Sequence, residues 1–253
     1  MVIKLNRERI EQNLKTDFLA RSLRVLDEID STQSYLFDNL NEFPDGAVII
    51  AESQSAGYGR MGRVWHSPYG EGVYMSILFK HIPPSPMAQF TLLGSLSLTG
   101  YLKIKYGFDF KLKWPNDVLI GENKIAGVLA EVKNGIAGLG FGINVNNNFN
   151  ELPQRATSLS LLTGETMDRD ILIAEFLNHF EQDYKRWQKS PYGYLRELWI
   201  NFALLRGKDV TVYVQNGTIK GTVEDITENC GLIIRTDMGF KTELLLNELI
   251  KIG

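Results

Sequence analysis

At residues 57–65 the chain reads Gly57-Tyr58-Gly59-Arg60-Met61-Gly62-Arg63-Val64-Trp65, shortly after an apolar run at residues 47–51. The glycines let backbone N–H groups approach a ligand closely, and the two arginines offer planar, permanently charged groups for phosphate. The pattern is neither a P-loop, which needs Gly-Lys-Ser/Thr, nor the dinucleotide fingerprint, which needs a helix immediately afterwards. An ordinary glycine-rich turn has a similar composition, so the loop alone leaves both interpretations open.

The segments around this loop predict a sheet covered by helices. Residues 47–52 and 73–80 have strand composition, which places the loop between two strands at one end of the sheet. Residues 87–106 are apolar on most sides and predict a helix packed on that sheet. Residues 168–188 carry apolar side chains at helical spacing opposite charged ones, and a shorter helix is expected from Tyr194 toward Leu205.

A second polar stretch is Lys113-Trp114-Pro115-Asn116-Asp117, where proline stops a strand and an Asn-Asp turn restarts it. Asp117 could help to hold Mg²⁺, with Asn116, or could simply close the turn. Lys124 begins the next strand, where it could face phosphate or remain a solvated lysine. Several fixed cations without a nucleophile pair favour phosphate-directed chemistry by positioning and electrostatics.

Two further features could contact a ligand or serve packing alone. Asp30-Ser31-Thr32 supplies side-chain oxygens that can cap a helix running to about Leu40, and a helix N-terminus is itself a site for ligand oxygens. Glycines alternate at positions 138, 140 and 142 of a predicted strand, which indicates that some group approaches the backbone closely.

Three domains are expected. Residues 1–24 form a linker-like segment with one apolar stripe at near-helical spacing, residues 25–205 form a catalytic domain, and residues 206–253 form a small β-domain. In the last, Val210, Val212 and Val214 alternate before Asn216-Gly217, a strong hairpin signal, so an antiparallel barrel or sandwich is predicted.

The composition excludes several classes of protein. A net charge of −3 gives no broad basic field for DNA, and 23% charged with 44% hydrophobic residues is typical of a globular chain. The single cysteine, Cys230, and three scattered histidines offer no zinc spacing and no readable catalytic triad. A chain without an apolar leader or bilayer-length segment is expected in the cytoplasm, with no membrane partner.

Taken together, the motifs resemble those of the biotin protein ligases. They occur in the family's order as Asp30-Ser31-Thr32, residues 52–65, and residues 113–117 followed by Lys124-Ile125-Ala126-Gly127, with Gly142-Ile143-Asn144 later. The resemblance runs from about residue 25 to the C-terminus. It implies an α+β fold of the class II synthetase-like biotin/lipoyl ligase type, with a central mixed or antiparallel sheet, packed helices and a small C-terminal SH3-like β-barrel.

The resemblance also implies roles for individual residues. Those that would bind biotin are Ser31, Thr32, Gln33, Gln54, Gly57, Tyr58, Gly59, Arg60, Lys124 and Gly127. Those that would bind ATP are Arg60, Arg63, Trp65, Asn116, Lys124 and Asn144. Lys124 and Arg60 would be the catalytic residues, and Asp117 the candidate Mg²⁺ ligand. The family usually has arginine at the position of Tyr58 and asparagine at that of Gln33, which leaves the side-chain roles of these two residues open.

The implied reaction is that of a biotin–[acetyl-CoA-carboxylase] ligase. Biotin attacks the α-phosphate of ATP to give biotinyl-5'-AMP, and a lysine of the biotin carboxyl carrier protein then takes the biotinyl group. The chain resembles the monofunctional type, without the N-terminal DNA-binding domain, and a monomer or weak homodimer is expected. The alternatives are a lipoyl or octanoyl ligase or transferase of the same fold, and a binding module in which the small C-terminal β-domain holds nucleic acid while the larger domain senses a nucleotide.

Overall fold

The computed structural model describes residues 3–81, 87–214, 217–245 and 249–252. Its larger part is a seven-stranded sheet with the strand order β1-β2-β3-β7-β6-β5-β4. The strands are β1 (Leu23–Ile29), β2 (Val48–Gln54), β3 (Gly72–Phe79), β4 (Phe110–Lys113), β5 (Asp117–Ile120), β6 (Asn123–Lys133) and β7 (Ile136–Asn144). β1 and β2 are parallel, whereas the other neighbouring pairs are antiparallel. The expected mixed sheet is therefore confirmed.

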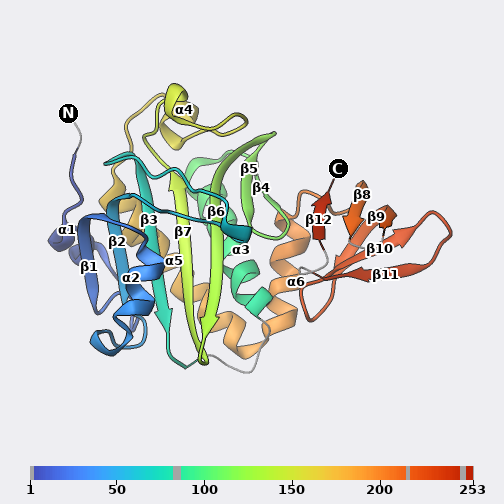
Figure 1. The fold of residues 1–253 in the computed structure, drawn as a ribbon, viewed down its shortest axis with the longest axis horizontal. Coiled ribbons are helices and arrows are strands. Elements are labelled where there is room, and N and C mark those ends of the chain that lie inside the picture. The colour runs from blue at the N-terminus through green and yellow to red at the C-terminus, as the bar shows by residue number, and fades with distance from the viewer. Residues whose placement is uncertain (1–2, 82–86, 215–216, 246–248, 253) are drawn as a thin grey trace.

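Helices cover the two faces of this sheet unequally (Figure 1). The core face carries α3 (Met87–Tyr106), α5 (Arg169–Lys189) and α6 (Pro191–Phe202), with α1 (Arg7–Asn13) packed beside α5. Among the described residues, the α-helix on the other face is the short α2 (Thr32–Asp38), over a small apolar cluster that includes Leu36, Ile49 and Leu78. Much of that second face is therefore open to other groups. The remaining helical segments in the part of the chain that the structure describes are α4 (Leu159–Thr163) and the 3₁₀ turns Leu40–Glu42, Arg60–Gly62 and Phe149–Glu151.

Alternation along β7 explains why its glycines fall at every second position. Successive side chains of a strand point to opposite faces. Phe141 points to the core face, where its ring packs edge-on against Phe176 and Phe180 of α5 at centroid distances of 5.0 and 5.8 Å. Gly138, Gly140 and Gly142 consequently share the α2 face, which they leave without side chains.

The described residues of the N-terminal segment pack into the body of the protein. Only residues 7–13 are helical, yet Ile10 and Leu19 are fully buried in the main core. The carboxylate of Glu181, on α5, accepts the backbone N–H groups of Asp17, Phe18 and Leu19. The apolar stripe was predicted, whereas no local pattern indicates that the buried Glu181 carboxylate fixes the following turn.

The C-terminal part is a five-stranded antiparallel sheet with the order β11-β10-β9-β8-β12 (Figure 1). Its strands are β8 (Asp209–Val214), β9 (Gly217–Ile226), β10 (Leu232–Thr236), β11 (Lys241–Leu244) and β12 (Leu249–Ile252). β8 and β9 pair as the hairpin signal predicted, although Asn216 itself lies outside the described residues. Among the described residues, no helix is both long and apolar enough to cross a membrane.

Candidate active site

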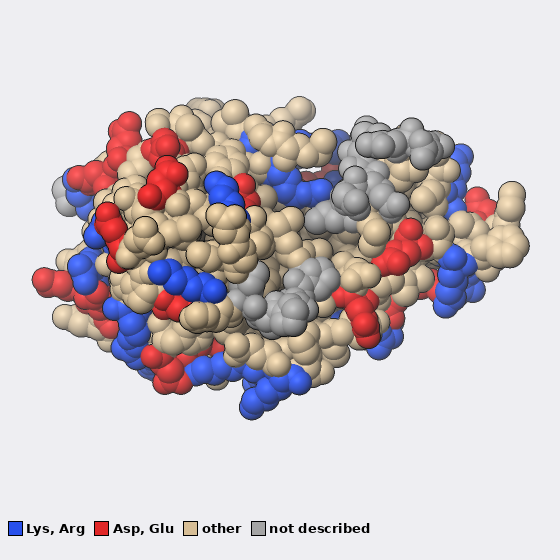
Figure 2. Space-filling model, turned by 60° about the horizontal axis from the view of Figure 1, so that its bottom comes forward, with Lys and Arg blue, Asp and Glu red and all other residues tan. Residues whose placement is uncertain are grey.

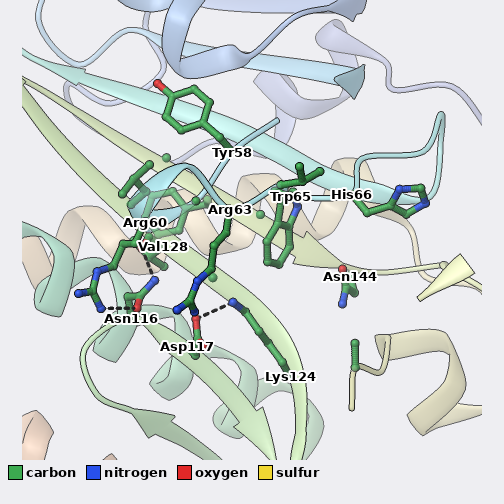
Figure 3. A pocket seen from close by; sticks show the side chains of 18 of the residues that line it. Tyr58, Arg60, Arg63, Trp65, His66, Asn116, Asp117, Lys124, Val128 and Asn144 are labelled. Atoms are coloured by element: carbon green, nitrogen blue, oxygen red, sulfur yellow. Dashed lines mark hydrogen bonds and ion pairs between the residues drawn. The ribbon is translucent and has the colours of Figure 1, made fainter. Parts of the chain in front are cut away.

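A cavity of about 490 Å³ lies on the open face of the large sheet, beneath the loop at residues 57–65 (Figure 3). Apart from Gly57, every residue to which the sequence analysis gave a binding, catalytic or metal role lines it: Ser31, Thr32, Gln33, Gln54, Tyr58, Gly59, Arg60, Arg63, Trp65, Asn116, Asp117, Lys124, Gly127 and Asn144. These residues come from α2, from the ends of β2, β5, β6 and β7, and from the connecting loops. A fold that joins segments more than 100 residues apart in sequence thus gathers them in one place.

The loop over the cavity is a small hairpin. The N–H of Gly59 donates to the carbonyl of Arg63 at 2.7 Å, and the N–H of Trp65 donates to the carbonyl of Gly57 at 2.8 Å. Gly57 is buried beneath this hairpin, where a Cβ atom would lie 2.8 Å from the Trp65 carbonyl oxygen. Position 57 therefore requires glycine for close packing, and not for contact with the cavity.

Trp65 occupies the space that two glycines leave on the sheet. Gly127 of β6 and Gly142 of β7 face each other across the strand pair. A Cβ atom at position 142 would lie 2.3 Å from the Trp65 ring, and one at position 127 would lie 3.2 Å from it. The indole Nε1 is buried without a hydrogen-bond partner among the described residues. The close approach predicted for the glycine strand is made by this ring and, at Gly138, by the side chain of Gln33.

Positive charge gathers at the end of the cavity near Asp117 (Figure 3). The Lys124 ammonium lies 2.6 Å from the Asp117 carboxylate and 5.1 Å from the centre of the Trp65 ring. Arg63 extends toward the same carboxylate (Figure 3). Burial lowers the pKa of the Arg60 guanidinium, although nearby Asp117 opposes this effect. Lys113, the cross-strand partner of Asp117, and Arg155 also line the cavity, so its cations outnumber the one lining carboxylate and an anionic ligand would neutralise the excess.

This local charge is not part of a broad basic surface on the face shown in Figure 2, where Lys and Arg are interspersed with Asp and Glu.

Asn116 positions the Arg60 side chain, because its Oδ1 accepts a hydrogen bond from the Arg60 guanidinium at 3.4 Å. Asn116 is in turn fixed to β6, because its Nδ2 donates to the Val128 carbonyl at 3.1 Å and its own carbonyl accepts the Val128 N–H. The amide of Asn116 thus positions an arginine.

The donors present do not form a magnesium cage. Asp117 is paired with Lys124, and the Asn116 oxygen accepts from Arg60, so both candidate ligands already have partners. Among the residues that the structure describes, no group of three or more Asp, Glu, His or Cys side chains could hold a metal ion. Mg²⁺ commonly binds through one or two carboxylates together with substrate phosphates, and the protein alone provides at most the first of these.

The end of the cavity next to α2 is polar but uncharged. Ser31 caps α2, as expected, since its Oγ accepts from the N–H groups of Gln33 and Ser34. The Gln54 Oε1 accepts both the N–H and the hydroxyl of Thr32, at 2.8 and 3.1 Å, and the Thr32 hydroxyl also lies 2.8 Å from that of Ser76. This network orders the floor of the cavity.

Gln33 completes that floor. It is 4% exposed, and its Nε2 donates to the Gly138 carbonyl at 2.8 Å. Its Oε1 is buried without a hydrogen-bond partner among the described residues, as is the Trp65 Nε1. A buried polar atom without a partner costs about 1–3 kcal/mol, so these two atoms are suited to contact a ligand.

Several lining residues were missed by the sequence reasoning. Ser76 lies inside a buried strand and carries no motif, and residues 152–156 belong to a loop without a signature. This loop is bonded to the start of β6, where the Lys124 N–H donates to the Arg155 carbonyl at 2.8 Å. Asn144 holds the same region, because its Nδ2 donates to the Thr157 carbonyl at 3.0 Å. Asn144, for which the resemblance implies a role in ATP binding, therefore also supports the wall of the cavity.

Comparison with known proteins identifies the family. Residues 25–148 match the model of the biotin/lipoate A/B protein ligase family, and residues 206–251 match that of the biotin protein ligase C-terminal domain. The bifunctional ligase/repressor BirA of Bacillus subtilis is 35% identical over 251 residues, which cover 94% of this chain and 77% of that protein. The chain belongs to the biotin protein ligase family. The resemblance drawn from the motifs is thereby confirmed.

Other biotin protein ligases support this assignment. The biotin–[acetyl-CoA-carboxylase] ligase of Paracoccus denitrificans is 28% identical, with 85% of this chain and 95% of that protein covered. The structure of the Aquifex aeolicus biotin protein ligase in complex with biotin and ATP superposes with a TM-score of 0.80 at 31% identity, covering 92% of this chain and 99% of that chain. The α+β fold expected for a biotin protein ligase is therefore confirmed.

Proposed function

We propose that this chain activates biotin with ATP and transfers it to a lysine of a biotin carboxyl carrier protein, as a biotin–[acetyl-CoA-carboxylase] ligase. The observation that carries the proposal is the division of one cavity into two ends. Next to α2 it offers a neutral polar floor with the unpartnered Gln33 Oε1, and next to β5 it offers a group of cations that includes Arg60, Arg63 and Lys124.

This division suits a reaction between a neutral ring system that carries a carboxylate and a polyphosphate. The polar floor, with Ser31, Thr32, Gln33 and Gln54, would hold the ureido ring of biotin beneath Tyr58, Gly59 and Gly127. The cationic end would hold the phosphates, with Trp65, Asn116 and Asn144 nearer the nucleoside. Mg²⁺ would accompany the ATP phosphates, since Asp117 is the sole carboxylate at that end among the described lining residues.

In the first step a biotin carboxylate oxygen attacks the α-phosphorus, the bond from this phosphorus to the α,β-bridging oxygen breaks, and pyrophosphate leaves with that oxygen. Negative charge shifts onto the leaving group, next to Arg60, Arg63 and Lys124, which are already in place. In the second step the neutral amine of the acceptor lysine attacks the biotinyl carbonyl and AMP leaves. The described lining residues offer no cysteine, so a covalent enzyme thioester is not part of this proposal.

The second candidate is activation of lipoate, because the matching family model includes lipoate ligases. Lipoate has no ureido group, so it would leave the Gln33 Oε1 and the polar floor without hydrogen-bond donors.

One experiment separates the two. The protein is incubated with ATP, Mg²⁺ and either biotin or lipoate, and the acyl-adenylate is detected by mass. We expect biotinyl-AMP and much less lipoyl-AMP. Lipoyl-AMP as the main product would favour the second candidate, and no adenylate with either acid would contradict both.

A further inference from the structure

A buried ion pair lies where α5 begins. The Arg169 guanidinium lies 2.7 Å from the Glu52 carboxylate, and the two side chains are only 3% and 2% exposed. Neither residue lines the active-site cavity, and the resemblance implies no role for either. Replacing a buried ion pair by apolar side chains of similar volume is often neutral for stability or even stabilising. Stability alone therefore does not explain why this position holds two charges.

The pair bridges two strands at the place where their ladder ends. Among the described residues, the pairing of β2 with β3 ends at Ala51 and Tyr74, before β2 itself ends. Beyond that point one guanidinium nitrogen, Nη1 of Arg169, donates to the Glu52 Oε2 and, at 3.2 Å, to the Gly72 carbonyl. A planar guanidinium holds several acceptors in a fixed geometry, which a single ammonium does not. Arg169 thus fixes the spacing of the two strand ends.

The N-terminal segment supplies the remaining hydrogen bonds of the pair. The second guanidinium nitrogen, Nη2 of Arg169, donates to the Ile3 carbonyl at 2.6 Å, and the Glu52 Oε1 accepts the N–H of Leu5. Both carboxylate oxygens and both terminal nitrogens therefore have partners. A buried polar network in which every member is satisfied is rigid, so the two side chains are held in one arrangement.

Each strand end that Arg169 holds leads to a different end of the cavity. Glu52 lies two residues before Gln54, whose side chain orders the polar floor next to α2. Gly72 is the cross-strand partner of Asn144, which lines the cavity on the side proposed for the nucleoside. The spacing of the two strand ends consequently affects where the two substrates lie relative to each other.

We propose that Arg169 is a positioning residue, which acts through Glu52 and Gly72 to align biotin with ATP for formation of the adenylate. The alignment rests on the proposed function, whereas the bridge between the strand ends does not. When the bridge is lost, each substrate keeps the side chains that contact it. The affinity for each substrate therefore changes little, and the rate of the reaction between them falls.

The variant Arg169→Lys tests this role, because lysine keeps a positive charge beside Glu52 but loses the planar group that bridges the strands. Single-turnover formation of biotinyl-AMP at saturating biotin and ATP should be about 10- to 100-fold slower, since a misplacement of about 1 Å can cost about 100-fold. The KM values for biotin and for ATP should each change by less than about threefold. A normal rate at saturation, with or without raised KM values, would overturn the proposal.

A second buried carboxylate on α5 gives a matched control for lost stability. Glu181 is fully buried and paired with Lys185 at 2.7 Å, outside the cavity. Glu181→Gln should lower the denaturation midpoint but leave the rate of adenylate formation within about twofold of the wild type. Equal slowing in Glu181→Gln and Arg169→Lys, under conditions where both are folded, would show that Arg169 acts through stability alone.

A double variant separates the two roles from the other direction. Arg169→Met/Glu52→Leu replaces the pair by apolar side chains, which should leave the denaturation midpoint closer to that of the wild type than Glu52→Leu alone does. The rate should remain at least about 10-fold lower, because no group then joins the strand ends. A rate that recovers together with the midpoint would contradict the positioning role.

Amide hydrogen exchange tests the bridge without any substrate. The Gly70 N–H donates to the Glu52 carbonyl at 3.0 Å, so its proton exchanges when the end of β2 opens. In ligand-free Arg169→Lys this exchange should be about 5- to 10-fold faster than in the wild type. Exchange at Leu78, whose N–H donates to the Ala47 carbonyl before the start of β2, should be unchanged. Unchanged exchange at Gly70 would overturn the bridge.

The two measurements also separate this inference from the proposed function. A wild type that forms no biotinyl-AMP would overturn the proposed function and, with it, the alignment of the substrates. The exchange rates at Gly70 would still decide whether Arg169 holds the strand ends together. A wild type that forms biotinyl-AMP, beside an Arg169→Lys variant of equal rate, would overturn the positioning role and leave the proposed function standing.

Discussion

At the scale of single residues, Trp65 lies against β6 and β7 because positions 127 and 142 have no side chains. Any Cβ atom at position 142 would lie well inside the van der Waals radius of the ring, at 2.3 Å. The ring is half-exposed and can move outward, so the conflict would be relieved by displacing Trp65 and not by deforming the sheet. A substitution on β7 can therefore act on the nucleotide end of the cavity.

We expect Gly142→Ala to raise the KM for ATP by about 10-fold, since stacking of a base on an aromatic ring is typically worth about 1–3 kcal/mol. The cost in the free energy of unfolding should be about 1–2 kcal/mol or less. Adenylate formation at varied ATP and a chemical unfolding curve measure the two effects. Gly107→Ala, in the turn after α3 and outside the cavity, is the control for the KM alone, because the φ of +73° at this position makes alanine destabilising by itself. An unchanged KM for ATP in Gly142→Ala would contradict the placement of Trp65 in the nucleotide site.

At the scale of elements, α5 does more than fill the core. Its periodic apolar residues pack on the sheet, while Glu181, with 0% exposure, holds the turn at residues 17–19 and pairs with Lys185 at 2.7 Å. Burial by itself would raise the pKa of Glu181, but the Lys185 ammonium and the three backbone N–H groups hold it below its ordinary value. The folded state thus stabilises the ionised form of the Glu181 carboxylate relative to the unfolded chain.

The contribution of Glu181 to stability therefore depends on pH. The pKa of Glu181 in the folded state lies below its ordinary value of 4.5, so its contribution to the free energy of unfolding is fully present above pH 4.5. This contribution is lost as the pH falls through the pKa of the folded state. Glu181→Gln should lower the free energy of unfolding by about 2–3 kcal/mol at neutral pH, and this difference should shrink below pH 4.5. Denaturant unfolding at several pH values measures it. Glu197→Gln, at an exposed position of α6, should have little effect at any pH. A difference that stays constant down to the lowest pH would contradict the assignment.

The same elements show what sequence reasoning can supply. The helical period of residues 168–188, the strand alternation of β7 and the glycine-arginine loop are local patterns, and each predicted its element. The gathering of site residues followed from motifs placed at strand ends. Contacts that depend on tertiary placement were not readable: Glu181 with residues 17–19, Tyr58 with Glu131, and the loop at 152–156 with Lys124. No periodicity records a bond between side chains that meet only after the sheet has formed.

At the scale of the whole molecule, the C-terminal sheet contacts the stretch that carries Asn116 and Asp117. The Trp114 indole N–H donates to the Cys230 carbonyl, in the turn between β9 and β10, at 3.0 Å. Gln89 of α3 donates to the Glu228 carbonyl in the same turn at 2.8 Å. Trp114 is 3% exposed and directly precedes Pro115 and Asn116. The turn at residues 227–231 thus supports residues 114–116, whose Asn116 positions the Arg60 side chain.

We expect Trp114→Phe to lower the free energy of unfolding by about 1 kcal/mol more than Trp199→Phe does, because one hydrogen bond is typically worth about 1 kcal/mol. The pair is matched, because Trp199 is also buried but its indole N–H has no partner among the described residues. Trp114→Phe should in addition slow adenylate formation, whereas Trp199→Phe should not. Equal unfolding free energies and equal rates in the two variants would show that the turn gives no support.

The central claim is that the cationic end of the cavity performs phosphate chemistry, and Lys124 tests it most directly. Single-turnover formation of biotinyl-AMP, at saturating ATP and biotin, is compared in Lys124→Gln and in Lys111→Gln, whose lysine lies outside the cavity and 3.4 Å from Asp109. A charge-assisted hydrogen bond worth about 1.5–3 kcal/mol in the transition state predicts a rate roughly 10- to 150-fold lower for Lys124→Gln, and an unchanged rate for Lys111→Gln. A normal rate in a normally folded Lys124→Gln protein would contradict the account.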